Sequence, residues 1–235
     1  MLPDTILVGD LQVNPELRDS HAYLDVIDER SARPTGMAVR WDVAHSIGHW
    51  HASVVVLAVD AEGKVALQQR GEKDSHGKWD VSVAGHQDAG ETDVTAGVRE
   101  AEEELGLKIN PARLIRLGSP YRFRKIGNPS IQFDHHESPT SYLYRTAKQN
   151  RERVSVFVVV LSACETACIR TGPSLASLAV KWVSVAEATA DAIHDAARHA
   201  SSFRQLFAHP EVAAELQKCV AGAIEASYGP NIRTP

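Results

Sequence analysis

One segment in the middle of the chain limits the fold more than any other, because it contains both the start and the stop signals of a helix. Thr92 is a suitable N-cap, and Gly106 stands where a helix C-cap favours a left-handed residue. Between them, apolar residues recur at steps of four, three and four, which predicts one buried stripe. The stripe consists of Val94, Val98, Ala101 and Leu105. The segment therefore predicts an amphipathic helix over residues 92–105.

Four glutamates crowd the second half of this predicted helix. Like charges three or four residues apart on a helix repel each other by roughly 0.2–0.5 kcal/mol per pair. With about 100° of rotation per residue, Glu100, Glu103 and Glu104 share one face, and Glu102 points elsewhere. Two interpretations are open. The face is either a solvated acidic surface or a site for a hard divalent cation such as Mg²⁺ or Mn²⁺.

Strand-like segments lie on both sides of this helix. Residues 51–60 form a continuous apolar run that predicts a buried central strand, and residues 64–70 follow it in hairpin register. Interleaved strands and helices predict the α/β class. The other predicted strands cover residues 22–28, 35–43, 78–85, 112–118, 141–146, 153–161 and 179–183.

The last fifty residues predict helices. Ser184 and Glu187 form a capping-box pattern, and Pro210 starts a second helix with Val212, Leu216 and Val220 on one face. Residues 1–20 show little pattern and predict an N-terminal arm. We therefore expect a single domain over residues 21–235, with a helical extension from about residue 185.

Composition excludes several classes of protein. A formal net charge of −5 argues against a general nucleic-acid binder, and no basic footprint is present. The longest strongly apolar run, residues 154–161, is too short to span a membrane. The N-terminus lacks the pattern of a signal peptide, and the three cysteines suggest reduced thiols, so a cytoplasmic location is expected. Residues 122–140 are polar and broken by Pro and Gly, which predicts a loop that determines substrate specificity.

The segment GHQDAGETDVTAGVREAEEELGL (85–107) resembles the signature of the Nudix hydrolases, G-x5-E-x7-R-E-U-x-E-E-x-G-U, in which U is apolar. All fixed positions match: Gly85, Glu91, Arg99, Glu100, Ala101, Glu103, Glu104, Gly106 and Leu107. The resemblance covers about residues 22–190. It implies a Nudix-type α/β/α sandwich around a mixed β-sheet, with the C-terminal helices added to it.

The resemblance also implies an activity. Nudix enzymes hydrolyse a diphosphate linkage in a nucleoside diphosphate or another small diphosphate compound, with Mg²⁺ or Mn²⁺ as cofactor. The implied metal ligands are the carbonyl of Gly85 and the carboxylates of Glu100, Glu103 and Glu104, and Glu100 or Glu103 is the implied general base. An ion pair between Glu91 and Arg99 is implied as a structural tie. Members of the family are often dimers, so the resemblance leaves a homodimer as an alternative to a monomer.

The flanking segments resemble the subgroup of Nudix hydrolases that is similar to isopentenyl diphosphate isomerase. His51 and His86 match two metal-binding histidines of that isomerase, whereas the spacing of His45 is one residue too short for the third. We expect His51 and His86 to contact the substrate. Histidines that shape the loop through hydrogen bonds are the alternative.

Two groups that the isomerase needs are replaced here. Ala84 occupies the position of its cysteine, and Asn150 the position of one glutamate. The sequence therefore favours hydrolysis, with isomerase-type activity and a non-catalytic diphosphate-binding module as alternatives. Glu152 is expected to act as a base or to complete the metal site, or else to be an exposed strand-edge charge. Arg70 either contacts phosphate or is an exposed residue at the end of a strand.

Overall fold

The computed structural model describes residues 4–9, 23–71, 75–126, 149–172, 176–208 and 210–228, and the chain divides into two compact units. Unit 1 comprises residues 1–53, 86–96 and 120–154, and unit 2 comprises residues 54–85, 97–119 and 155–235. The division falls within four elements: β4 (Trp50–Val59), β7 (Val83–His86), α4 (Asp93–Leu105) and β10 (Gln149–Val160). The predicted single domain over residues 21–235 stays a prediction.

Unit 1 contains a three-stranded antiparallel sheet and a short helix. The strand order is β1 (Thr5–Leu7), β3 (Pro34–Arg40) and β2 (Tyr23–Ile27). The strand predicted over residues 35–43 is wrong at its end, because α3 (Trp41–Ile47) begins directly after β3. Val43 and Ala44 are buried against Leu24 of β2, so tertiary packing overrides the strand propensity here. Gly48 ends the helix at a φ of 82°.

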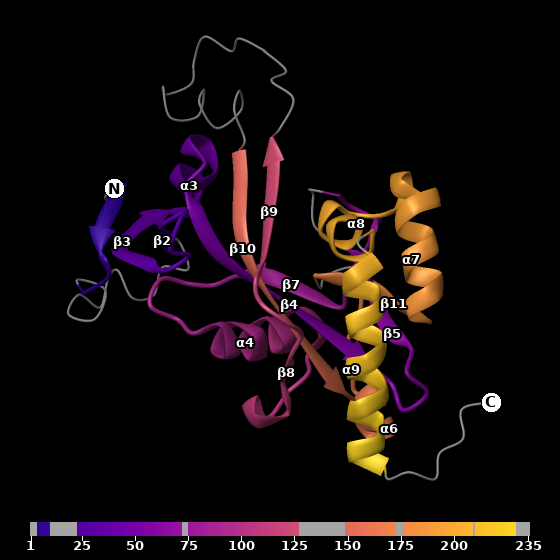
Figure 1. Cartoon of the computed structure of the whole chain (residues 1–235). Helices are drawn as coiled ribbons and strands as arrows, with labels where there is room; N and C mark the ends of the chain where they lie inside the picture. The colour runs from indigo at the N-terminus through magenta and orange to yellow at the C-terminus, as the bar shows by residue number, and fades with distance from the viewer. Residues whose placement is uncertain are drawn as a thin grey trace. The chain divides into compact units, whose positions relative to one another are not determined.

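A larger sheet has the order β11-β5-β4-β10-β8 (Figure 1), with β11 (Ser177–Val183), β5 (Val65–Arg70) and β8 (Ile115–Arg116). Three further strands pair with it: β6 (Trp79–Asp80) with β5, β7 with β4, and β9 (Tyr121–Ile126) with β10. Every residue of β4 is buried, which confirms the predicted central strand. The α/β class is confirmed as well.

Two predicted strands are shorter and more broken than expected. Residues 78–85 form the separate strands β6 and β7, and residues 112–118 form the short helix η1 (Pro111–Arg113) followed by β8. Pro111 favours the first turn of a helix, and Asn110 accepts a hydrogen bond from Ala112 N, so this stretch begins as a helix. The loop predicted over residues 122–140 is wrong at its start, because residues 122–126 belong to β9, which pairs with β10. The rest of that loop, residues 127–140, and the strand predicted over residues 141–146 lie outside the described residues.

The central helix α4 follows the prediction at both ends. Thr92 Oγ1 accepts a hydrogen bond from Thr95 N at 3.1 Å, and Gly106 has a φ of 69°. The buried face is shifted from the predicted stripe. Ala96, Ala101 and Leu105 are fully buried, whereas Val94 and Val98 are only half-buried.

In unit 2, the C-terminal helices α7 (Val185–His194), α8 (Ser201–Phe207) and α9 (Pro210–Tyr228) pack against one another (Figure 1). The capping box of Ser184 and Glu187 is present, and the predicted apolar face of α9 is buried. Two shorter helices are α6 (Ala163–Ala167) and η2 (Ala196–Arg198). Within the described ranges, no helix has the length and apolar character needed to cross a membrane.

Candidate functional site

In unit 2, the carboxylate of Glu100 on α4 lies directly against the backbone of Gly85 on β7. A Cβ atom at Gly85 would overlap this carboxylate, well inside the 3.0 Å that Cβ atoms keep from other atoms. Glycine is therefore required for this close approach. Arg99 Nη1 donates to Glu100 Oε1 at 2.9 Å and to Glu103 Oε2 at 3.2 Å. The side chain of Glu100 is 13% exposed and that of Glu103 is 51% exposed.

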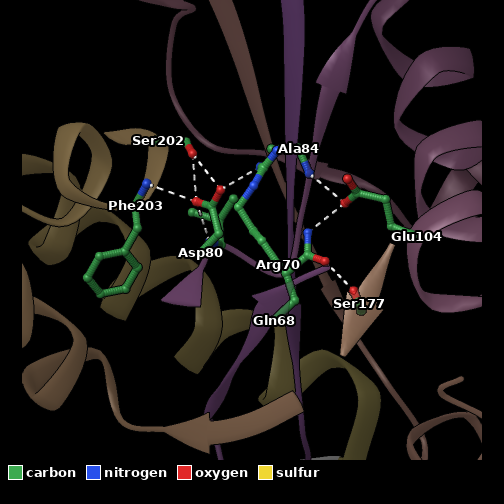
Figure 2. Close-up of polar contacts among 9 residues, drawn as sticks. Gln68, Arg70, Asp80, Ala84, Glu104, Ser177, Ser202 and Phe203 are labelled. Carbon is green, nitrogen blue, oxygen red and sulfur yellow. Dashed lines mark hydrogen bonds and ion pairs between the residues drawn. The ribbon is translucent and has the colours of Figure 1, made fainter. Parts of the chain in front are cut away.

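Glu104, one helical turn after Glu100 on α4, is held by β5 and β7 (Figure 2). Its Oε2 accepts hydrogen bonds from Gln68 Nε2 at 2.7 Å and from Ala84 N at 3.1 Å. Gln68 Oε1 in turn accepts a hydrogen bond from Ser177 Oγ. Burial first, and the charge of Glu100 second, raise the pKa of Glu104 to about 8. A bound cation would reverse this rise, because it favours the charged carboxylate.

Arg70 lies at the end of β5 and pairs with a buried carboxylate (Figure 2). Its Nη1 donates to Asp80 Oδ2 at 2.9 Å, and the arginine side chain is 20% exposed. The alternative of an exposed strand-end arginine is therefore wrong. Asp80 is fully buried and also accepts hydrogen bonds from Ser202 Oγ and Phe203 N of α8.

In unit 1, three histidines and one glutamate gather at a second place. One ligand atom from each of His45, His51, His86 and Glu152 lies within 4.8 Å of the others. His45 comes from α3, His51 from β4, His86 from the end of β7 and Glu152 from β10. Across the part of the chain that the structure describes, this is the one group with the geometry to hold a metal ion. Glu100, Glu103 and Glu104 do not form such a group there.

Two of these histidines are prepared as neutral ligands. His45 Nδ1 lies 2.7 Å from the carbonyl oxygen of Trp41, and His51 Nδ1 lies 2.9 Å from that of His49. Because a carbonyl oxygen only accepts, each Nδ1 carries the proton and Nε2 presents its lone pair. Burial is the main cause and the neighbouring histidines a further cause that lower the pKa of His45 to about 3 and that of His51 to about 4. His51 Nε2 is buried and has no hydrogen-bond partner among the described residues.

Glu152 is part of this cluster, so the alternative of an exposed strand-edge charge is wrong. Its Oε2 accepts a hydrogen bond from Ser53 Oγ at 2.8 Å, and its Oε1 accepts one from Asn150 Nδ2. His86 Nε2 lies 3.6 Å from Oε1. Burial alone would raise the pKa of Glu152, but its contacts with the histidines and Ser53 hold this pKa well below its usual range.

The sequence ranked His45 below the other two histidines because its spacing to His51 is one residue short. The helical turn of α3 brings its side chain, which is 1% exposed, to the cluster in spite of that spacing. The signal that would have found it is the helix start at Trp41, which the strand-like sequence of residues 35–43 concealed. Glu102 behaves as predicted, since it points to solvent and pairs with Lys108 at 3.4 Å.

The structure thus combines an α/β fold, a carboxylate-bearing helix packed against a glycine, and a cluster that could hold a metal ion. The family model described as NUDIX domain matches residues 49–206. That match covers more than half of the chain. The chain therefore belongs to the Nudix family, as the signature in residues 85–107 predicts.

The relatives agree on the family and diverge in their names. An uncharacterized Nudix hydrolase of Clostridium acetobutylicum is 40% identical over 101 residues, which cover 41% of this chain and 48% of the relative. An isopentenyl-diphosphate Delta-isomerase of Halobacterium salinarum is 30% identical over 102 residues, covering 42% of this chain and 45% of the relative. The chain spans less than half of the length of the curated relatives it matches.

Among solved structures, the crystal structure of DR0079 from Deinococcus radiodurans resembles this chain with a TM-score of 0.52. The two are 21% identical, and the match covers 79% of this chain and 97% of the other. At this identity the likeness supports the fold alone.

Proposed function

We propose that this protein is a hydrolase that cleaves the diphosphate linkage of a small molecule with the help of a divalent metal ion. The observation that carries the proposal is the packing of Glu100 against Gly85 in unit 2, where a side chain larger than hydrogen does not fit. This packing brings a carboxylate of the Nudix signature to the backbone of the glycine that opens the signature. Relatives named Nudix hydrolases support the reaction class.

The donor atoms of the signature in unit 2 are of the kind that a hard divalent cation prefers, and binding would have to draw together three carboxylates that do not converge without it. The proposed donors are the carbonyl of Gly85 and the carboxylates of Glu100, Glu103 and Glu104, and oxygen donors suit Mg²⁺ or Mn²⁺. Burial, together with the negative charge of Glu100, raises the pKa of Glu104, and a bound cation would favour its charged form. When bound, the metal would neutralise the diphosphate oxygens and make a bound water more acidic.

The side chains of this chain have distinct proposed roles. Arg99 holds Glu100 and Glu103 through one guanidinium nitrogen and so limits their movement. Glu103 is half exposed and is the better placed of the two to accept a proton from water, as the general base. Arg70 binds a phosphate oxygen through its guanidinium group.

Substitution of two neighbouring glutamates on α4 tests the proposal. Glu103→Gln removes a charge from the proposed site and should reduce phosphate-product release by 100-fold or more, on the order of the loss of a general base. Glu102→Gln is the matched control, since Glu102 is equally exposed on the same helix and pairs only with Lys108 among the ion pairs of the described residues. Equal activity of the two variants would contradict the assignment of α4 as the metal-binding helix.

A second candidate function arises from the cluster in unit 1. Three histidines and Glu152 form a donor set of the kind expected for the isomerase-like subgroup, and an isomerase is among the relatives. Ala84 and Asn150 stand where that isomerase has reactive groups, which disfavours proton transfer to and from an alkene. Dimethylallyl diphosphate formed from isopentenyl diphosphate would establish the second function. Its absence, with hydrolysis of other diphosphates present, would exclude it.

A further inference from the structure

We infer that Asp80 is a positioning residue that fixes the guanidinium of Arg70 for the diphosphate of the substrate, and that α8 in turn fixes Asp80. The inference rests on the proposed function, because it assigns the support of the same phosphate-binding arginine. It makes the C-terminal helix α8, which lies far from the Nudix signature in sequence, a part of the substrate site.

The hydrogen bonds to Asp80 leave its carboxylate little freedom to move (Figure 2). Oδ1 accepts from Val81 N at 2.9 Å and Phe203 N at 3.1 Å, and Oδ2 accepts from Arg70 Nη1 at 2.9 Å. Ser202 Oγ lies 2.6 Å from Oδ1 and 2.8 Å from Oδ2. Four donor groups thus surround a carboxylate that has about four acceptor sites. Its orientation is set from β6 and from α8 together.

Stability alone is a weak reason for this arrangement. Burying a carboxylate is costly, and well-packed apolar residues of similar volume often stabilise a protein as well as a buried ion pair does. The side chain of Arg70 is 20% exposed, so it is not fully withdrawn from solvent as Asp80 is. A planar guanidinium oriented by a fixed carboxylate is well suited to bind phosphate oxygens.

Strand β5 brings this arginine close to the signature helix. Gln68 and Arg70 are two residues apart on β5, so their side chains lie on the same face of the strand. Gln68 bonds to Glu104, and the charge of Arg70 also acts on Glu104. One strand face therefore presents an arginine fixed by Asp80 beside a carboxylate of α4. The ligand class that this pair fits is a diphosphate that carries a divalent cation.

Binding of inorganic pyrophosphate tests the inference without any need for turnover. We would measure its affinity by calorimetry, in the presence of Mg²⁺, for wild type, Arg70→Ala, Asp80→Asn and the double variant. Each single change should weaken binding by about 10- to 100-fold, as expected for one charge-assisted contact. If Asp80 acts through Arg70, the double variant should bind no more weakly than Arg70→Ala.

A more conservative substitution, with its own control, tests the inference if Asp80→Asn does not fold. Ser202→Ala removes one donor to Asp80 and should weaken pyrophosphate binding by about 3- to 10-fold. Ser184→Ala is the matched control, because it removes the capping hydroxyl of α7 and leaves Asp80 and Arg70 untouched. This control should bind pyrophosphate as wild type does, even if it lowers the melting temperature as much as Ser202→Ala does.

Three results would overturn the inference. The first is that Ser202→Ala binds pyrophosphate with wild-type affinity. The second is that the losses of affinity in Arg70→Ala and Asp80→Asn multiply in the double variant. The third is that the wild type does not bind pyrophosphate. Failure of the proposed function gives a different result. In that case pyrophosphate binding and its dependence on Asp80 persist, while no diphosphate compound is hydrolysed.

Discussion

Replacing Gly85 by alanine is the most informative single change, because its effect follows directly from the geometry. The new Cβ atom would overlap the Glu100 carboxylate. That carboxylate is the end of a flexible side chain, whereas Gly85 is fixed in β7, so the carboxylate moves and the strand stays. The variant should therefore fold and lose the proposed metal site.

The size of the effect can be worked out from the required movement. The closest atoms of the carboxylate would lie 2.0 Å from the new Cβ atom, so the carboxylate has to retreat by about 1.4 Å to reach ordinary contact at 3.4 Å. A displacement of about 1 Å in a reacting arrangement costs on the order of 100-fold in rate, or about 2.7 kcal/mol of barrier. The free energy of unfolding should change by less than about 1 kcal/mol, because a side-chain end can move to another rotamer.

The assay compares hydrolysis rate, Mg²⁺ affinity and urea unfolding of Gly85→Ala with those of Gly172→Ala. The control adds the same methyl group where nothing lies within 4 Å. Gly85→Ala should lose activity and metal affinity, and Gly172→Ala should lose neither. Full activity in Gly85→Ala would refute the role of the contact between Gly85 and Glu100. Unfolding of the variant would refute the claim that the side chain yields and the strand does not.

Further changes address the rest of the structure. Burial raises the pKa of Asp25 above its unfolded value, so the folded state holds a proton that the unfolded chain has lost, and stability declines as pH rises through this window. Asp25→Asn should abolish that decline in urea unfolding measured between pH 4 and 8. Leu216→Ala in α9 should lower the free energy of unfolding by about 2–5 kcal/mol, since Leu216 is fully buried; a loss below 1 kcal/mol would argue against the docking of α9. His51→Asn should abolish Mn²⁺ binding to the histidine cluster in a calorimetric titration, whereas His49→Asn, outside the cluster, should retain it.

Local signals in the sequence predicted α4, α7 and α9 well. Thr92, Gly106 and the capping box at Ser184 act on neighbouring backbone groups, so their effects can be read from a few adjacent residues. The buried strand β4 could be predicted equally well, because a strand that is buried on both faces has a continuous apolar run in place of alternating apolar and polar residues.

Contacts between residues that lie far apart in the sequence could not be predicted from such local signals. Asp80 looked like an ordinary residue of a strand, and its partners in α8 lie more than 120 residues further along the chain. The start of α3 was hidden because Trp41 and Val43 favour strands, and only burial against β2 selects the helix. Glu100, Glu103 and Glu104 were placed on one face by helical periodicity. Their different exposure depends on Gly85 and Gln68, which no helical pattern contains.

The most direct test of metal-dependent diphosphate hydrolysis is product analysis with a panel of diphosphate compounds in ¹⁸O-labelled water. The panel should include nucleoside diphosphate derivatives, dinucleotides, coenzyme A and isoprenoid diphosphates. With Mg²⁺ or Mn²⁺, at least one compound should give two phosphate-bearing products, one of which carries a single ¹⁸O, and chelation of the metal should stop the reaction. Turnover that persists after chelation, or the absence of turnover across the whole panel, would contradict the proposed function.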